Sequence, residues 1–340
     1  MDEHPVTDLR RVRPVQTDQG DGDLPTDALD LDLGPQLGRV VDLDDLSGDA
    51  QAHEVLLTSG RRDCNPHYVF SVTSGRTGRP GPTVPAMRVA FVGKGGAGKS
   101  SLAGSFARVL ASSGERVLAL DSDPMPGMAF SLGVAQTDAG LPDEAVEQYD
   151  HEDGQRRWRL RTGMTGPTIV EQYAVRGPEG VRFLQLGKAH GPRWDNTRQH
   201  VGFQHVLDDL PGAGWSIVGD LPGGTRHPFL TWGRYARTLV VVVEPTPASM
   251  LTGRRLARLS AGTDGPRVVV VANKVRDVDD AAWVARSTGL PLLGWVPFDP
   301  ALPDADRQGL AVLDVDPDGP TARAVRSLVA AARTQDEESA

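Results

Sequence analysis

The stretch Gly93-Lys94-Gly95-Gly96-Ala97-Gly98-Lys99-Ser100 meets the spacing G-x-x-x-x-G-K-S in full. Glycines at these places let the backbone curl so that successive N–H groups face a phosphate, and a helix that follows adds its positive end. In such a loop Lys99 reaches the β- and γ-phosphates, and the Ser100 hydroxyl is a ligand for Mg²⁺. The stretch predicts a phosphate-binding loop, and we count the next residue, Ser101, as part of the same nucleotide site.

The segments on either side of this loop have the pattern that it requires. Residues 87–92 form a continuous apolar run, which is typical of a strand buried on both faces of a parallel sheet. After the loop, apolar residues recur at helical spacing, and Ser112-Ser113-Gly114 ends the helix. A strand, a glycine-rich loop and a helix in this order favour a nucleotide site over a glycine-rich turn without a ligand.

Strands and helices alternate through the rest of the chain. Further strands are predicted at 116–120, 158–160, 181–186, 215–218, 239–243, 268–271 and 292–296, and helices around 199–210, 248–261, 279–288 and 320–333. Such an alternation predicts an α/β fold with a doubly wound, mostly parallel sheet. We expect one domain of this kind over residues 86–334 and a short acidic tail at 335–340.

The first 85 residues differ in composition from the rest. The chain carries a net charge of −9, and residues 1–50 hold 13 acidic residues against four arginines, so the remaining residues balance to zero. Low hydrophobicity with high charge predicts a disordered extension, and an acidic arm that binds a partner is the alternative. Residues 74–82 are rich in Gly and Pro and predict a linker.

Composition also bears on the classes of partner. A core without a basic excess, behind an acidic extension, argues against general nucleic-acid binding. The longest apolar runs, such as 238–243, are too short to span a bilayer, and the acidic start does not resemble a signal peptide. The only cysteine, Cys64, excludes an intrachain disulfide. We therefore expect a cytoplasmic protein with no stable membrane insertion.

The second lysine of the loop, Lys94, carries a family resemblance. The variant K-G-G-x-G-K-[ST] resembles the deviant Walker A motif of the P-loop ATPase family that includes ParA, MinD, the arsenite-pump ATPase, nitrogenase iron protein and CooC-type ATPases. The resemblance covers essentially all of residues 87–316. It implies a homodimer that forms around ATP, in which Lys94 reaches the phosphates bound by the partner subunit and acts in hydrolysis together with Lys99.

Two acidic segments are similar to the switches of that family. Asp121-Ser122-Asp123-Pro124 resembles the first switch, and the resemblance assigns to Asp123 the orientation of the attacking water, with Asp121 in support. Asp220 resembles the acid of the second switch and would hold Mg²⁺ through a water molecule. Acids after strands are also common in turns, which is the alternative for both segments.

Two further segments are similar to the adenine site of the family. Asn273 and Lys274 follow one strand, and Pro297 ends another, with Phe298 and Asp299 next to it. The resemblance implies that these positions contact the base, although an asparagine after a strand is usually a turn residue. All these segments lie at the carboxyl ends of predicted strands, where open α/β sheets bind their ligands.

The CooC-type branch of the family is the most similar in detail, for example at Gly294–Asp299. That branch carries a Cys-x-Cys pair for nickel, whereas this chain has Gly191–Asn196 at about that place and no cysteine there. A thiolate nickel site is therefore absent. Four histidines, His190, His200, His205 and His227, could offer imidazoles, but ordinary surface or core histidines are the simpler interpretation.

The resemblance implies Mg-dependent binding and hydrolysis of ATP, in a molecular switch or a maturation-type accessory protein that acts on an unidentified client or regulatory protein. A ParA- or MinD-like positioning or regulatory ATPase is the first alternative. A basic membrane helix of the MinD type is not found, because the 320–333 segment is followed by Asp336-Glu337-Glu338. A nucleotide-gated interaction protein with negligible turnover is the alternative of another class.

Overall fold

The computed structural model describes residues 56–62, 65–71, 86–123, 127–135, 140–187, 197–210, 214–225, 233–261 and 265–338. Contacts between Cα atoms divide the chain into two compact units, Met1–Thr83 and Val84–Ala340. In the first unit, β1 (Leu56–Arg62) and β2 (Asn65–Ser71) pair as an antiparallel hairpin in which Leu56 lies opposite Ser71. The predicted disorder of residues 1–50 and the predicted linker at 74–82 lie outside the described residues.

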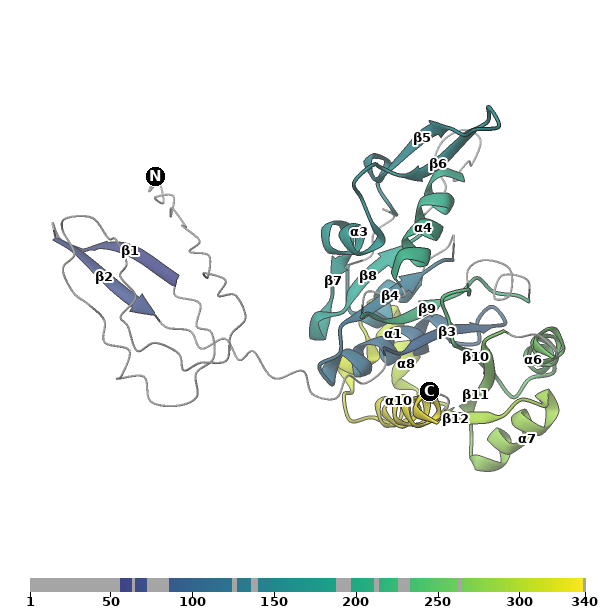
Figure 1. The fold of residues 1–340 in the computed structure, drawn as a ribbon. Helices are drawn as coiled ribbons and strands as arrows, with labels where there is room; N and C mark the ends of the chain where they lie inside the picture. Colours follow the sequence, from purple (N-terminus) through teal and green to yellow (C-terminus); the bar gives the residue numbers. More distant parts are fainter. Residues whose placement is uncertain are drawn as a thin grey trace, which may run out of the picture. The chain divides into compact units, whose positions relative to one another are not determined.

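The second unit is an α/β structure (Figure 1). Its strands are β3 (Arg88–Gly93), β4 (Val117–Asp121), β5 (Val146–Asp150), β6 (Arg156–Leu160), β7 (Val175–Arg176), β8 (Arg182–Gln185), β9 (Ser216–Asp220), β10 (Thr238–Val243), β11 (Arg267–Val275) and β12 (Leu292–Pro297). Its helices are α1 (Lys99–Ser112), α2 (Met128–Leu132), α3 (Gly166–Tyr173), α4 (Thr197–Asp209), α6 (Pro247–Ser260), α7 (Val278–Thr288), α8 (Ala301–Gln308), α9 (Val312–Val315) and α10 (Pro320–Glu337), with single 3₁₀ turns at η2 (Asp143–Ala145) and η3 (Pro178–Gly180).

Eight strands form one sheet in the order β12-β11-β10-β3-β9-β4-β8-β7. All neighbouring strands pair in parallel except β7 and β8, which are antiparallel. The chain first moves from β3 towards β8, then returns to fill the place between β3 and β4 with β9, and continues on the other side of β3. The reversal puts β3 at the point where the order changes direction, which is where such sheets bind ligands. The predicted doubly wound, mostly parallel sheet is confirmed.

The strand predicted at 158–160 is present, but it does not belong to this sheet. Residues 158–160 belong to β6, which pairs only with β5 in a separate antiparallel hairpin. Arg156, Arg157 and Arg159 are exposed, so this strand could not be buried between two layers of helices. The short elements β5, β7, α2, α3, α8 and α9 were not predicted, and α10 continues to Glu337, into the residues that we expected to form an acidic tail.

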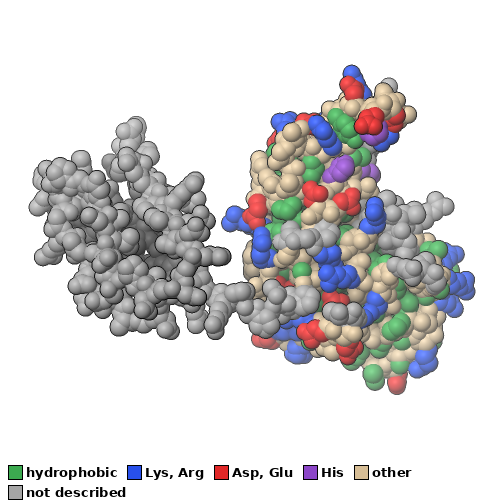
Figure 2. Space-filling view, viewed as in Figure 1, with side chains coloured by type: hydrophobic (Ala, Val, Ile, Leu, Met, Phe, Trp, Pro, Cys, Tyr) green, Lys and Arg blue, Asp and Glu red, His purple; other side chains and the backbone are tan. Residues whose placement is uncertain are grey.

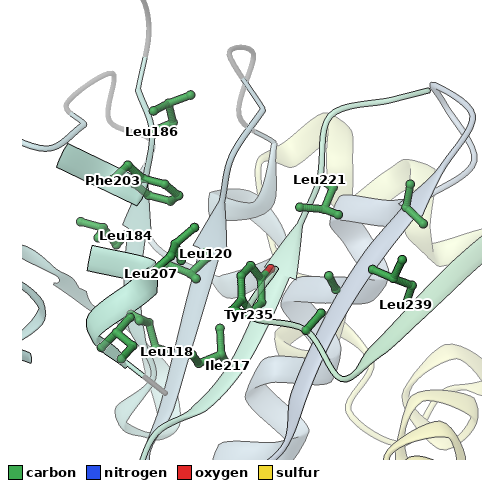
Figure 3. Packing of buried hydrophobic residues seen from close by; sticks show 14 of the residues in the cluster. Leu118, Leu120, Leu184, Leu186, Phe203, Leu207, Ile217, Leu221, Tyr235 and Leu239 are labelled. Carbon is green, nitrogen blue, oxygen red and sulfur yellow. The ribbon is translucent and has the colours of Figure 1, made fainter. Parts of the chain in front are cut away.

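The two faces of the sheet carry two separate apolar cores. Alternate residues of the strands pack against α1, α2 and α10 on one face and against α3, α4, α6 and α7 on the other. Figure 3 shows part of the second core, where Leu118 and Leu120 of β4, Leu184 of β8 and Ile217 of β9 lie close to Phe203 and Leu207 of α4. Since both faces are covered, the ligand-binding positions of the sheet are left at the ends of the strands. No helix in the described part of the chain is both long and apolar enough to cross a membrane.

Candidate nucleotide-binding site

The phosphate-binding loop connects the end of β3 to the start of α1. Gly98 is the residue before α1 and has a φ of 90°, and Gly96 has a φ of 82°. Both values lie in the left-handed region that residues with a side chain rarely adopt. A Cβ at Gly98 would lie 2.4 Å from Nδ2 of Asn273, and one at Gly93 would lie 2.4 Å from the carbonyl oxygen of Val242. Gly93, Gly96 and Gly98 are therefore required by backbone conformation, and Gly93 and Gly98 also by close packing.

Neighbouring strands hold the loop in this shape. The N–H of Ala97 donates to the carbonyl oxygen of Lys94 at 3.2 Å, which closes a turn at the tip. The amide Nδ2 of Asn273, from β11, donates to the carbonyl oxygen of Ala97 at 2.8 Å. Lys99 follows as the first residue of α1 and is buried, whereas Lys94 is half-buried beside the exposed glycines of the tip.

A buried acid, Asp220, lies at the start of α1. It is the last residue of β9, and one carboxylate oxygen accepts a hydrogen bond from the Ser100 hydroxyl. Its other oxygen, Oδ1, is buried and has no hydrogen-bond partner among the described residues. Burial and the nearby Asp121 carboxylate raise the pKa of Asp220, while the Ser100 hydroxyl and the Lys99 ammonium oppose this rise. A buried carboxylate with a free oxygen is suited to a cationic ligand or its water shell.

Asp121, the last residue of β4, organises the loop after that strand. Its Oδ1 accepts from the N–H of Asp123, and its Oδ2 accepts from the N–H groups of Gly127 and Met128, each at 3.0 Å. Burial raises the pKa of Asp121, and these three hydrogen bonds partly offset the rise. Asp121 thus fixes the position of half-buried Asp123 and the start of α2 through the backbone.

A cavity of about 380 Å³ extends from the phosphate-binding loop towards α8, which is large enough for a nucleotide. The loop and the start of α1 line it with Gly96, Gly98, Lys99, Ser100 and Ser101. Asn273 and Lys274 of β11 line it next to the loop, and Phe298, Leu302 and Pro303 line it from the segment after β12 and from α8. Phe298 is an apolar side chain that is 59% exposed, and Oδ1 of Asn273 is buried without a hydrogen-bond partner among the described residues. The cavity therefore offers an apolar surface at Phe298 and one unused acceptor at Asn273.

The structure brings together most of the positions singled out in the sequence. Gly96, Gly98, Lys99, Ser100, Ser101, Asn273 and Lys274 line the cavity, and Asp220 contacts Ser100. Pro297 is not among the residues that line it, although the next residue, Phe298, is. Asp299 also lines the cavity, and its carboxylate accepts from the N–H of Ala301, at the start of α8, and from the hydroxyl of Thr321 in α10. Its role is therefore to tie the loop after β12 to these two helices.

Sequence reasoning missed two walls of the cavity. Leu302 and Pro303 belong to α8, and Gly127, Phe130 and Ser131 belong to α2 or directly precede it. Both helices are short, and α8 contains a proline, so their periodicity is weak. The sequence does contain a signal for the ends of these two helices. Gly133 and Gly309 follow α2 and α8, and both adopt the left-handed conformation that is typical of the residue after a helix.

The histidines do not form a site in the described part of the chain. His200 and His205 both lie on α4, and His190 and His227 lie outside the described residues, as does the 191–196 segment. No group of three or more His, Cys, Asp or Glu side chains that could hold a metal ion occurs among the residues that the structure describes.

Known proteins share this sequence pattern and this fold. The carbon monoxide dehydrogenase accessory protein CooC of Rhodospirillum rubrum is 29% identical over 252 residues, which are 68% of this chain and 91% of that protein. Protein Rv2184c of Mycobacterium tuberculosis is 43% identical over 197 residues, which are 54% of this chain and 43% of that protein.

Among solved structures, the septum site-determining protein MinD of Pyrococcus horikoshii, complexed with Mg-ADP, aligns with a TM-score of 0.57. The alignment covers 75% of this chain and 99% of that one at 19% identity, so it demonstrates a shared fold. The sequence profile of the CobQ/CobB/MinD/ParA nucleotide binding domain matches residues 89–312, which is more than half of the chain. The predicted family is confirmed, and the chain belongs to the CobQ/CobB/MinD/ParA nucleotide-binding family.

Proposed function

We propose that the protein binds Mg·ATP and hydrolyses it as a nucleotide-dependent homodimer. The observation that carries the proposal is a single cavity whose lining combines two kinds of chemistry. Lys99, Ser100 and the loop amides are suited to a triphosphate, and Asn273 and Phe298 are suited to a base. Asp220 adds a buried anionic group next to Ser100.

The residues around Ser100 fit a magnesium ion. The Ser100 hydroxyl would be a direct ligand, and Asp220 would hold a bound water through the oxygen that has no partner among the described residues. When bound, Mg²⁺ neutralises charge that develops on the β- and γ-phosphate oxygens. The proximity of Ser100 and Asp220 supports this assignment, because the two groups come from residues 120 positions apart in the chain.

The protein's own residues supply the other parts of phosphoryl transfer. Lys99 would bind the β- and γ-phosphates, and Asp123 would accept a hydrogen bond from the attacking water and orient it. Asp121 holds the backbone N–H of Asp123, so the carboxylate that orients water sits on a fixed loop. Lys94 would contact the phosphates bound by the partner subunit, since it lies at the exposed tip of the loop.

Asn273 is suited to the edge of adenine. Its Oδ1 can accept a hydrogen bond from the exocyclic amino group, and one N–H of its Nδ2 is engaged by Ala97, which leaves the second N–H for a ring nitrogen. Phe298 would lie against the base in the place that we first assigned to Pro297. Lys274 also lines the cavity, but its ammonium group is engaged by the carbonyl oxygen of Gly96 and by Glu244, so we assign it no contact with the base.

Isothermal titration calorimetry of the full chain with Mg²⁺ and ATP, ADP or GTP tests the proposal. We expect micromolar binding of both adenine nucleotides and at least about tenfold weaker binding of GTP, since a mismatched polar edge costs at least ~1.4 kcal/mol. Hydrolysis is measured in parallel with labelled ATP in a single turnover. An absence of heat with adenine nucleotides would refute the nucleotide site itself, whereas tight binding without cleavage would favour the nucleotide-gated interaction protein.

The Lys94→Ala variant tests the role of the second lysine. We expect it to keep ATP affinity within a few-fold of the wild type, because the loop amides and Lys99 remain. Its turnover should fall by about 10³, the usual effect of losing a cation supplied by a partner. Light scattering should find it monomeric with Mg·ATP, and a variant that dimerises and turns over normally would exclude the cross-subunit role.

The Asp123→Ala variant tests the orientation of water. It should bind ATP normally and accumulate as an ATP-bound dimer, with cleavage slowed by about 10²–10³ because the nucleophile is no longer oriented. Size-exclusion chromatography followed by analysis of the bound nucleotide measures this. Rapid conversion of bound ATP to ADP in the variant would move the catalytic role to another acid.

A switch or accessory role in the maturation of a client protein is the best-supported use of this cycle. It is supported by the similarity to a carbon monoxide dehydrogenase accessory protein. This chain has no Cys-x-Cys pair, because it contains one cysteine. A MinD-like regulatory role is the second candidate, supported by the shared fold. On the face seen in Figure 2, positive and negative side chains are interspersed.

Two binding experiments separate the second candidate from the first. Co-sedimentation with duplex DNA over a salt series and flotation with anionic vesicles, each with Mg·ATP, should both be negative for a cytoplasmic accessory protein. ATP-dependent recruitment to vesicles or DNA would instead favour a positioning ATPase.

A further inference from the structure

Two consecutive residues at the end of β11 bind two consecutive carbonyl groups of the phosphate-binding loop. Nδ2 of Asn273 donates to the carbonyl oxygen of Ala97, and Nζ of Lys274 donates to that of Gly96 at 2.9 Å. In a regular strand, neighbouring side chains point to opposite faces of the sheet and could not both reach one loop. The local backbone of β11 must therefore depart from a regular strand.

That departure is found at Lys274. Its φ is 57°, and Lys274 and Glu179 are the only non-glycine residues with a positive φ among the described residues. The register between β11 and β12 also shifts between Asn273 and Val275. A lysine in the left-handed region is strained, and such strain is commonly found at functional sites. Here it allows both side chains to reach the loop.

A carboxylate from the neighbouring strand fixes the ammonium group. Oε1 of Glu244, directly after β10, lies 2.6 Å from Nζ of Lys274. The N–H of Glu244 in turn donates to the Ser249 hydroxyl in α6. Because β11, β10 and β3 are adjacent in the sheet, Lys274 and Glu244 connect the ends of three central strands at the tip of the loop.

This connection reaches Lys94 through one planar peptide group. The carbonyl oxygen of Gly96 accepts from Lys274, and the N–H of Ala97, in the same peptide plane, donates to the carbonyl oxygen of Lys94. If the Gly96–Ala97 peptide rotated, both bonds would break together and the turn that carries Lys94 would open. We propose that Lys274 is a positioning residue that holds this turn so that Lys94 is presented to the partner subunit.

The inference rests on the proposed function, because it concerns how Lys94 acts in hydrolysis. It predicts a loss of turnover with little loss of nucleotide affinity, since Gly98 is held by the N–H of Leu102 and Ser100 by Asp220, and neither contact involves Lys274. An ordinary surface ion pair would contribute little stability and would leave turnover unchanged. The side chain of Lys274 is 40% exposed, so its removal leaves no large cavity.

The experiment uses the full-length Lys274→Met variant, which keeps the apolar stem and removes the ammonium group. We expect its single-turnover cleavage of Mg·ATP to be about tenfold slower and its Kd for Mg·ATP to change less than threefold, as for a misplaced catalytic group. Lys274→Arg, which keeps a cationic donor, should recover most of the rate. In a Lys94→Ala background, Lys274→Met should cause no further loss, because both act on the same step.

Two variants make the outcome decisive. Lys274→Gly relieves the strain at φ 57° and removes the same contact, so a similar loss of rate is expected even if Lys274→Met folds poorly. Arg326→Met is the matched control. Like Lys274, Arg326 binds one carbonyl oxygen and one carboxylate, those of Pro317 and Asp318, but it does so away from the cavity. Wild-type rates in Lys274→Met and Lys274→Gly would overturn the inference. A wild-type protein that neither binds nor cleaves ATP would instead overturn the proposed function.

Discussion

Replacing Lys99 by alanine is expected to weaken Mg·ATP binding by at least about a hundredfold, which corresponds to a loss of ~3 kcal/mol. Lys99 is the first residue of α1, and only 7% of it is exposed, so its ammonium group acts where water is scarce. An anionic triphosphate at this place would lose a buried cationic partner, and the buried Asp220 would lose a nearby cation. Calorimetry on the variant measures the effect directly.

The same titration on the Arg326→Met variant serves as the control. Arg326 is exposed and far from the loop in sequence, so the Kd of this variant should match that of the wild type. Circular dichroism should find the Lys99→Ala variant folded, because the substitution introduces alanine at the start of a helix. An unchanged Kd in a folded Lys99→Ala protein would be incompatible with the phosphate-binding role of this loop.

A second large effect is expected from Gly219→Ala, in the strand that ends at Asp220. A Cβ at this position would lie 1.5 Å from the hydroxyl oxygen of Tyr235 and 2.8 Å from its Cζ. Tyr235 is buried in the core that Figure 3 shows and cannot move aside without displacing its neighbours. We expect a loss of ~3 kcal/mol in the free energy of unfolding, at the upper end of the usual cost of overpacking.

Urea denaturation measures this loss, and Tyr235 provides the internal control. The Tyr235 hydroxyl is buried without a hydrogen-bond partner among the described residues, so Tyr235→Phe alone should be neutral or stabilising. In combination with Gly219→Ala it should restore part of the stability, because the closest atom is gone. Full stability of Gly219→Ala by itself would mean that the segment before β10 is not packed against β9 in solution.

Much of the candidate site could be predicted because it is local in sequence. The loop from Gly93 to Ser100 specifies its own conformation through glycine spacing, and a strand and helix on either side follow from periodicity. The acids Asp121 and Asp220 were identified by their resemblance to the switch segments of the family, each at the end of an apolar strand. Their buried environment and the contact between Asp220 and Ser100 depend on β9 inserting between β3 and β4, which no local pattern encodes.

The misassigned elements have a physical cause as well. Strand β6 has strand-like residues at 158–160, but its arginines keep it out of the central sheet, and a short run cannot indicate its partner. The helices α2 and α8 are too short for a clear period, yet they form walls of the cavity. Lys274 was assigned to the base by its resemblance to the adenine site of the family. Its contact with Gly96 depends on a left-handed backbone at Lys274, which no sequence pattern indicates.

By itself the sequence determined the phosphate-binding loop, the alternation of strands and helices, and the family, because these depend on spacing between near neighbours. Only the tertiary structure decided which side chains meet: Ser100 with Asp220, Asn273 with Ala97, and Lys274 with Gly96 and Glu244. These contacts join residues more than a hundred positions apart, or lie on adjacent strands whose order is set by packing. The physical reason is that a parallel sheet places the carboxyl ends of its strands at one edge. Which strands are neighbours at that edge depends on how the helices cover both faces of the sheet.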